Sequence, residues 1–190
     1  MRIVGGMWRG RALLAPEGRG TRPTTDRTRE SIASMVLSAF DLDLSGVAVL
    51  DAFAGSGAIG LELLSRGARS CTFVERDRRA SGMVRGNIEA LGVSSAQACV
   101  QVGDVLSLAE RGLVQGDPFG LVVLDPPYAM GAQQVSRLVC DLAAAGQLAP
   151  RAVVLYEHAS DAGGLRLPRA ELLRSRSHGA TAVTLYRMDT

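Results

Sequence analysis

Hydrophobic and polar residues alternate along this chain in blocks, and the period of the pattern changes repeatedly between that of a strand and that of a helix. Short runs of aliphatic and β-branched residues predict strands over 47–51, 70–75, 98–102, 121–124 and 152–157. Longer amphipathic stretches between them predict helices over 59–65, 79–91, 105–111 and 132–145. This regular alternation predicts an α/β fold built on a mostly parallel sheet.

The N-terminal part of the chain departs from this alternation. The first fifteen residues alternate weakly and contain Gly5, Gly6 and Gly10, a pattern that suits a short β-hairpin. A segment rich in proline, glycine and threonine follows, and a helix is predicted over 28–40 with Thr25 or Asp26 as its N-cap.

The C-terminal part also differs, because the segments on either side of residues 177–179 predict a closing antiparallel hairpin. The chain has 190 residues, which is enough for one domain with a substantial core. We therefore expect a basic N-terminal hairpin extension over 1–20 and a single domain over 21–190.

The composition of the chain indicates which broad class of protein it belongs to. A hydrophobic content of 47% favours a folded globular chain over a disordered one. No apolar run approaches the length of a membrane span, and the N-terminus lacks the apolar core of a signal peptide, so we expect a cytoplasmic protein without a membrane partner. Cys71, Cys99 and Cys140 are far apart, which favours reduced thiols over a disulfide or a metal site.

The basic residues carry a second signal. All 21 are arginine, and the absence of lysine excludes a P-loop and Schiff-base chemistry on a lysine. Residues 1–29 hold seven arginines against Glu17 and Asp26, giving +5, so the rest of the chain sums to −3 from the total of +2. A basic arm on a mildly acidic body indicates a polyanionic partner. A solvated terminus is the alternative interpretation.

Carboxylates end four successive predicted strands, at Asp51, Glu75, Asp104 and Asp125. Each one alone is equally consistent with a helix cap or a loop acid. Because ligands of open parallel sheets bind beyond the carboxyl ends of the strands, we expect these side chains to form an acidic rim. Such a rim requires a cation or hydrogen-bond donors to compensate the charge.

A glycine motif, Gly55-x-Gly57-x-x-Gly60, follows the first strand of the alternating region and matches a dinucleotide-binding loop. With Glu75 available to a ribose, the motif suits NAD and S-adenosylmethionine equally. Asp51 would repel a pyrophosphate but attract the ammonium of a methionine moiety, by about 4 kcal/mol before desolvation at 4 Å. Asp104 could accept a hydrogen bond from an adenine amine, and the balance favours S-adenosylmethionine over a nicotinamide cofactor.

The stretch Asp125-Pro126-Pro127-Tyr128 stands directly behind a buried strand. The Asp125 carboxylate and the Pro126 carbonyl are suitable acceptors for an exocyclic amine, and the prolines restrict the backbone that aims them. Tyr128 offers a face on which a base extracted from its helix can stack. A stiff turn with a packed tyrosine is the structural alternative.

Taken together, these motifs resemble those of a known protein family. The segments "VLDAFAGSGAIGLELLSRGA", "FVERD", "GDV" and "VVLDPPY", in this order, resemble the class I amino-methyltransferases. With "RPTTDRTRES" ahead of them and a glycine- and arginine-rich N-terminus, the chain resembles the RsmD family of 16S rRNA guanine-N2 methyltransferases. This resemblance covers nearly the whole chain.

The resemblance implies a Rossmann-like methyltransferase fold with a seven-stranded sheet. It implies an enzyme that uses S-adenosylmethionine, releases S-adenosylhomocysteine and acts on 16S rRNA of the small ribosomal subunit or its assembly intermediate. We expect a monomer that needs no metal. The catalytic residues it implies are Asp125, Pro126, Pro127 and Tyr128. The cofactor contacts it implies are Asp51, Phe53, Gly55, Gly57, Glu75, Asp104, Arg22 and Thr24. The RNA contacts it implies are Trp8, Arg9, Arg11 and Arg27.

Three other functions remain open on the residues alone. The first is a DNA or other RNA amino-methyltransferase that acts on adenine N6 or cytosine N4, although 190 residues leave little room for a separate recognition region. The second is a nicotinamide-dependent oxidoreductase with the same glycine pattern. The third is a non-catalytic RNA-binding assembly factor that retains the fold.

Overall fold

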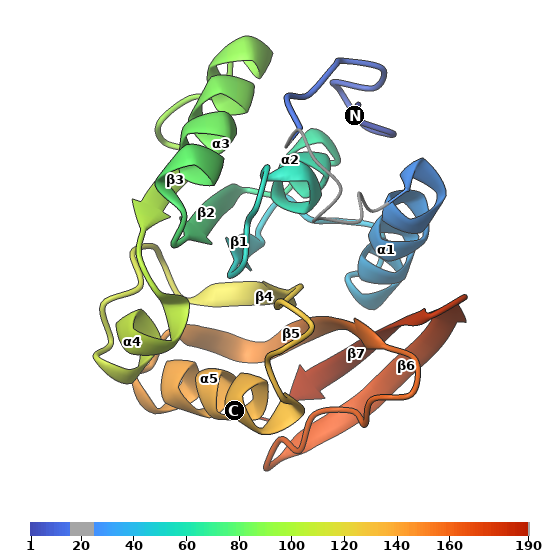
Figure 1. The fold of residues 1–190 in the computed structure, drawn as a ribbon, viewed down its shortest axis with the longest axis vertical. Coiled ribbons are helices and arrows are strands. Elements are labelled where there is room, and N and C mark those ends of the chain that lie inside the picture. Colours follow the sequence, from blue (N-terminus) through green and yellow to red (C-terminus); the bar gives the residue numbers. More distant parts are fainter. Residues whose placement is uncertain (16–24, 190) are drawn as a thin grey trace.

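The computed structural model describes residues 1–15 and 25–189, and one seven-stranded sheet forms the centre of this part of the chain (Figure 1). The strands are β1 (Ala48–Asp51), β2 (Ser70–Glu75), β3 (Ala98–Val102), β4 (Phe119–Leu124), β5 (Leu148–Ala159), β6 (Ala170–His178) and β7 (Thr181–Met188). The helices are α1 (Asp26–Ala39), α2 (Ala58–Ser65), α3 (Arg78–Leu91), α4 (Val105–Glu110) and α5 (Ala132–Ala144).

The strand order is β3-β2-β1-β4-β5-β7-β6. The strands from β1 to β5 pair in parallel, whereas β7 pairs antiparallel with both β5 and β6. Helices α1, α2 and α3 cover one face of the sheet, and α4 and α5 cover the other (Figure 1). The predicted α/β architecture with a closing antiparallel hairpin is therefore confirmed.

The central strands are buried on both faces, which explains their nearly continuous apolar sequences. Along β4, Leu121 and Val123 pack into the core beneath α1, α2 and α3, while Val122 and Leu124 pack into the core beneath α4 and α5. Side chains of one strand therefore alternate between two separate hydrophobic cores.

Strand order reverses at β1, which lies between β2 and β4. Two successive connections carry the chain outward to β3 on one side, and the next carry it to β4 and β5 on the other. At such a switch point the loops that follow neighbouring strands diverge and leave a crevice. The glycine loop follows β1 and the Asp-Pro-Pro-Tyr turn follows β4, and these two strands are paired in parallel, so both motifs begin at the same edge of the sheet.

Some boundaries differ from the sequence-based expectations. Helix α1 begins at Asp26 rather than at residue 28, because Thr25 is the N-cap and its hydroxyl accepts a hydrogen bond from the Thr28 amide. Strand β5 begins at Leu148, before the Pro150 that interrupts the apolar pattern. The predicted N-terminal hairpin is reduced to a single antiparallel bridge between Arg2 and Ala12. The expected boundary at residue 20 lies outside the described residues.

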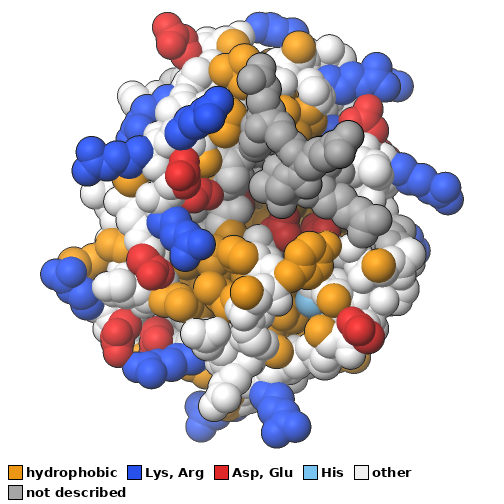
Figure 2. All heavy atoms as spheres, in the orientation of Figure 1, with side chains coloured by type: hydrophobic (Ala, Val, Ile, Leu, Met, Phe, Trp, Pro, Cys, Tyr) orange, Lys and Arg blue, Asp and Glu red, His pale blue; other side chains and the backbone are white. Residues whose placement is uncertain are grey.

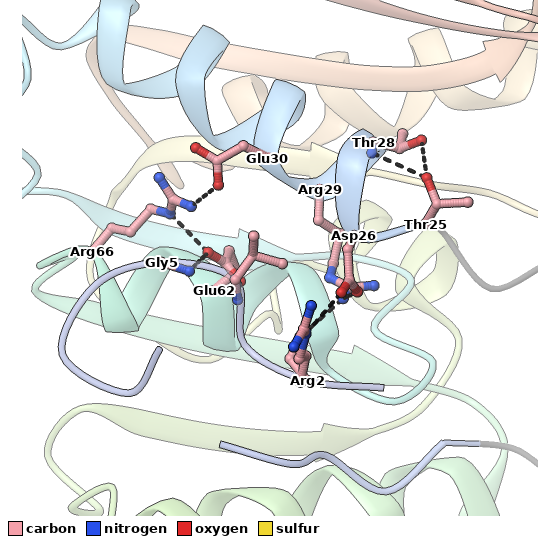
Figure 3. A network of polar contacts seen from close by, with 10 residues as sticks. Arg2, Gly5, Thr25, Asp26, Thr28, Arg29, Glu30, Glu62 and Arg66 are labelled. Atoms are coloured by element: carbon pink, nitrogen blue, oxygen red, sulfur yellow. Dashed lines mark hydrogen bonds and ion pairs between the residues drawn. The ribbon is translucent and has the colours of Figure 1, made fainter. Parts of the chain in front are cut away.

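The N-terminal segment, residues 1–15, lies on α2 through a buried carboxylate (Figure 3). Glu62 is only 2% exposed, and its two oxygens accept the amide protons of Val4 and Gly5 at 2.7 and 2.8 Å. One turn further along the helix, the Ser65 hydroxyl accepts from the Trp8 amide and donates to the Gly5 carbonyl. A Cβ atom on Gly6 would lie 1.9 Å from the Ser65 carbonyl oxygen, so glycine is required at this contact.

Two arginines extend this network to α1. Arg66 donates to Glu62 at 2.8 Å and also pairs with Glu30 of α1. Arg29 is 2% exposed, pairs with Asp26 at 2.6 Å and donates to the Arg2 carbonyl at 2.9 Å (Figure 3). The N-terminal segment is therefore held against two helices of the domain by hydrogen bonds and ion pairs.

None of the helices within residues 1–15 and 25–189 has both the length and the hydropathy that crossing a membrane requires.

The Glu62 contacts give the first prediction. Replacing Glu62 with alanine leaves two amides and the Arg66 Nε–H without their acceptor, so we expect the free energy of unfolding to fall by about 2–4 kcal/mol. Urea denaturation measures this change, and Glu62→Gln, which retains one acceptor oxygen, should lose less. Amide hydrogen exchange at Val4 and Gly5 should accelerate in the alanine variant. Unchanged protection of these two amides would contradict the proposed docking role of Glu62.

Candidate active site

Carboxyl groups gather at the edge of the sheet where β1, β2, β4 and β5 end. Asp51 ends β1, Glu75 ends β2, Asp125 follows β4, and Glu157 lies near the end of β5. Strand β1 is paired in parallel with both β2 and β4, so the predicted residues Asp51, Glu75 and Asp125 lie along one edge of the sheet. Figure 2 shows acidic side chains recessed near the centre of one face, with hydrophobic side chains beside them.

Asp104, the remaining predicted carboxylate of this rim, has a different position. It is exposed, and it caps α4 by accepting the amide proton of Leu106 at 2.9 Å. Its strand, β3, is at the edge of the sheet, next to β2. Asp104 therefore stands beside the crevice as a helix cap.

Glu75 forms hydrogen bonds with the backbone of the glycine loop and of the residues that follow β2. The two Glu75 oxygens accept the amide protons of Gly55 and Asp77, each at 2.8 Å. Gly55 and Gly57 have φ values of 54° and 79°, in the region that glycine adopts most easily. Phe53, in the loop itself, is half-buried against the core beneath α4 and α5.

Gly60 allows helix α2 to pack closely against strand β2. A Cβ atom at this position would lie 2.4 Å from the Phe73 ring and 2.7 Å from the Cys71 sulfur, so α2 approaches β2 closely only with glycine there. The same first turn of α2 is bound by Asp51, whose Oδ2 accepts the Gly60 amide proton at 3.1 Å. Asp51 is 3% exposed, and burial, with smaller contributions from Asp125 and Glu75, raises its pKa to about 7 against the lowering effect of this hydrogen bond.

The Asp-Pro-Pro-Tyr turn forms one side of a pocket. Burial raises the pKa of Asp125 to about 6. The Pro127 carbonyl accepts the Met130 amide proton at 2.8 Å, which closes the turn, and Tyr128 remains 71% exposed. The pocket measures about 50 Å³, and its walls come from the turn and from the end of β5.

Glu157, on the β5 side of this pocket, was not predicted from the sequence. In the register of β4 and β5, Leu124 pairs with Tyr156, so Asp125 and Glu157 follow on adjacent strands. Burial, and secondly the charge of Asp125, raises the pKa of Glu157 to about 8. A signal was present, because the strand predicted over 152–157 also ends in a carboxylate.

His158 lines the same pocket but is held by the fold. Its Nε2 lies 3.0 Å from the Thr184 hydroxyl, and its Nδ1 lies 2.8 Å from the Ala159 carbonyl oxygen. Its ring stacks on Tyr156 with a centroid distance of 4.7 Å. These contacts agree with the expectation that His158 occupies a strand position.

The predicted RNA-contacting residues lie on the N-terminal segment and on α1. Arg9, Arg11 and Arg27 are exposed, and Arg11 also donates to the Ala90 carbonyl of α3. Trp8 is half-buried, and its ring packs against the core beneath α1, α2 and α3. Arg22 and Thr24, which were expected near the cofactor, lie outside the described residues.

Comparison with known proteins places this site in a family. A family model described as "Conserved hypothetical protein 95" matches residues 1–187. Ribosomal RNA small subunit methyltransferase D of Escherichia coli strain K12 is 35% identical over 191 residues, covering 100% of this chain and 90% of that protein. The chain belongs to the RsmD family.

Solved structures agree with this family assignment. The Escherichia coli protein yhhF is similar with a TM-score of 0.82 and 34% identity, covering 100% of this chain and 98% of that one. Magnesium protoporphyrin IX methyltransferase of Synechocystis, solved with bound S-adenosylmethionine, has a TM-score of 0.63 at 15% identity over 90% of this chain and 86% of its own. This RsmD-family chain therefore has the class I methyltransferase fold that its sequence predicts.

The elevated pKa of Asp125 gives a second prediction, on stability. The folded pKa of about 6 lies above the ordinary value of 3.8, so the unfolded chain ionises first and stability is lost as the pH rises through the folded pKa. Asp125→Asn should therefore raise the free energy of unfolding by about 1–3 kcal/mol at pH 8, with little change at pH 4.

Urea denaturation at the two pH values measures this difference. Asp161→Asn, at an exposed position, is the matched control and should show no gain that depends on pH. An equal effect of Asp125→Asn at pH 4 and pH 8 would show that burial does not penalise the charge of Asp125.

Proposed function

We propose that this chain transfers a methyl group from S-adenosylmethionine to the exocyclic N2 amine of a guanine in 16S rRNA of the small ribosomal subunit. The observation that carries the proposal is the position of the Asp125–Tyr128 turn, which follows β4, the strand paired with β1 at the switch point of the sheet, while the glycine loop follows β1. Membership in the RsmD family, whose Escherichia coli relative is named a small-subunit rRNA methyltransferase, supports the choice of substrate.

The crevice residues suit S-adenosylmethionine. Buried carboxyl groups that raise one another's pKa are stabilised by a cationic ligand, and this cofactor carries an ammonium and a sulfonium group. We propose that Asp51 faces the ammonium and that Glu75 accepts the ribose hydroxyls. The other proposed contacts are Phe53, Gly55, Gly57, Asp104, Arg22 and Thr24. When bound, S-adenosylmethionine supplies an electrophilic methyl group on sulfur.

The chain's own contribution is to position the amine and raise its nucleophilicity. The lone pair of an exocyclic amine is delocalised into the base. Acceptors that take hydrogen bonds from its N–H groups return electron density to the nitrogen and make the amine more nucleophilic. We propose that the Asp125 carboxylate and the Pro126 carbonyl, which both belong to residues lining the pocket, have this role, with Pro127 restricting the turn. Asp125, with a pKa of about 6, can also receive the proton that the methylated amine releases.

Tyr128 completes the proposed base site. The ring extends from the turn and is 71% exposed, so its face is available to a base that has left its helix. Stacking on an aromatic ring contributes about 1–3 kcal/mol per base. Positioning of the reacting atoms can contribute about 7–11 kcal/mol of the barrier reduction.

We further propose that the N-terminal segment contacts RNA. Arg9 and Arg11 are exposed on a segment whose backbone is bound to α2 and α3, so they would meet RNA with little loss of backbone entropy. Trp8 and Arg27 complete this proposed surface. We expect the active form to be a monomer, with the rRNA as its partner.

A third prediction separates the catalytic turn from the cofactor loop. Labelled methyl transfer from S-adenosylmethionine to small subunits from a strain lacking its own RsmD enzyme should fall by at least 10²–10³-fold in Asp125→Ala. The dissociation constant for S-adenosylhomocysteine should change only a few-fold in that variant. Glu75→Ala should instead weaken binding of S-adenosylhomocysteine by about 10-fold or more, because two ribose hydrogen bonds are lost.

Several results would contradict this assignment. Retained turnover in Asp125→Ala would remove the catalytic role of Asp125, and an unchanged dissociation constant in Glu75→Ala would remove Glu75 from the ribose site. For the wild-type chain, tight NADH binding without S-adenosylhomocysteine binding in equilibrium dialysis would favour an oxidoreductase. RNA affinity without transfer to any ribosomal particle would favour an assembly factor.

A fourth prediction concerns the N-terminal surface. Replacing Arg9 and Arg11 together with glutamate should raise the KM for small subunits about 10-fold and reduce the salt dependence of binding, with the slope falling by about 1–2. The matched control is Arg174→Glu with Arg176→Glu, on exposed positions of β6, which makes the same change in net charge. Equal effects of the two pairs would show that net charge alone attracts the RNA.

A further inference from the structure

Glu157 lies beside the catalytic turn, and the proposed chemistry does not use it. Leu124 and Tyr156 are paired in the parallel register of β4 and β5, and both pack into the core beneath α4 and α5. The next residues, Asp125 and Glu157, therefore follow directly on adjacent strands. Both residues line the same pocket, so the two carboxyl groups lie on one side of the sheet edge.

One oxygen of Glu157 lacks a hydrogen bond in the described part of the chain. Oε2 is buried and has no donor within reach there. Buried polar atoms are nearly always paired, so an unpaired one calls for a functional explanation such as a ligand. A carboxyl group can accept a hydrogen bond in either protonation state, since the neutral form keeps a carbonyl oxygen.

The described residues around Glu157 do not use this acceptor oxygen, so it is available to a ligand in the pocket. Asp125, Pro126, Tyr128 and Glu157 all line this pocket. The adjacent His158 already contacts Thr184 and Ala159 through its two ring nitrogens. Two carboxyl groups therefore border one small pocket from adjacent strands.

The hydrogen-bond donors and acceptors on the Watson–Crick edges differ among the bases, and two carboxyl groups in one pocket can distinguish them. Guanine presents two neighbouring donors on its Watson–Crick edge, the ring N1–H and the N2 amine. Adenine and cytosine present an amine beside a ring nitrogen that is an acceptor. Two neighbouring acceptors therefore match guanine, whereas the ionised form of a second carboxyl group would face the lone pair of a ring nitrogen in adenine or cytosine.

We propose that Glu157 accepts the N1–H of the target guanine while Asp125 and the Pro126 carbonyl hold its N2 amine. This inference rests on the proposed function and assigns Glu157 as the residue that selects guanine over adenine and cytosine. Sites that hydrogen-bond a particular group reject an analogue that lacks it, because their own polar atoms are then left unpaired.

The test compares guanine with 2-aminopurine at the target position of reconstituted small subunits. 2-Aminopurine keeps the N2 amine but has no hydrogen on N1. We expect wild-type protein to prefer guanine, and Glu157→Met, which has similar length and no carboxyl acceptor, to reduce the ratio of the two kcat/KM values by about 10–100-fold. Glu157→Gln offers an acceptor oxygen to guanine N1–H but can also donate from its amide to N1 of 2-aminopurine, so its preference should lie between those of the wild type and Glu157→Met. Glu171→Gln, at an exposed position of β6, is the control.

Each outcome decides one point. If Glu157→Met slows both substrates by the same factor, Glu157 only supports the structure and the inference is wrong. If the wild-type protein methylates neither substrate, the proposed function has failed instead. Should the methionine variant not fold, Glu157→Ala removes the same acceptor without filling the pocket, and the ratio is measured in that variant.

Discussion

The site depends on the parallel register of the central strands, which places carboxyl groups at one edge of the sheet. Asp51, Asp125 and Glu157 are desolvated there, and their pKa values rise to about 7, 6 and 8. Such a cluster opposes folding at neutral pH, because each charge is formed more easily in the unfolded chain. Binding a cationic cofactor and N–H donors would reverse this cost, so the same groups that destabilise the unliganded chain would recognise its ligands.

The N-terminal segment depends on a second buried carboxylate with a different role. Glu62 meets two backbone amides and Arg66, so its charge is compensated within the fold. Ser65, Asn87 and Arg29 add hydrogen bonds from α2, α3 and α1. The arginines of this segment are consequently presented from a defined position on the domain. RNA would therefore bind to an ordered surface, and this surface is fixed to α2, the helix that begins directly after the glycine loop.

Local sequence patterns were sufficient to predict most of the fold. The strand and helix alternation, the glycine loop and the turn at Asp125 each depend on residues close in sequence, and the parallel pairing of β2, β1 and β4 puts the ends of these strands at one edge of the sheet. Asp104 shows the limit of this reasoning, because an aspartate between a strand and a helix is also the usual helix cap.

Other features depend on contacts between distant segments. Glu62 occupies a position in α2 that has no local signature of burial, and only its meeting with residues 4 and 5 explains it. The two residues that share the pocket wall, Asp125 and Glu157, become neighbours through strand pairing rather than sequence spacing. The hairpin predicted for the N-terminus was wrong in extent, since its backbone groups bind α2 and α3 in addition to one another.

Mass spectrometry of the nucleosides from small subunits treated with the wild-type protein and S-adenosylmethionine tests the account most directly. Two neighbouring acceptors at the amine site require N2-methylguanosine as the new nucleoside, at one position and absent without the protein. Formation of N6-methyladenosine or N4-methylcytidine instead would contradict the reading of the base by Asp125 and Glu157, and the absence of any methylated nucleoside would contradict the proposed activity.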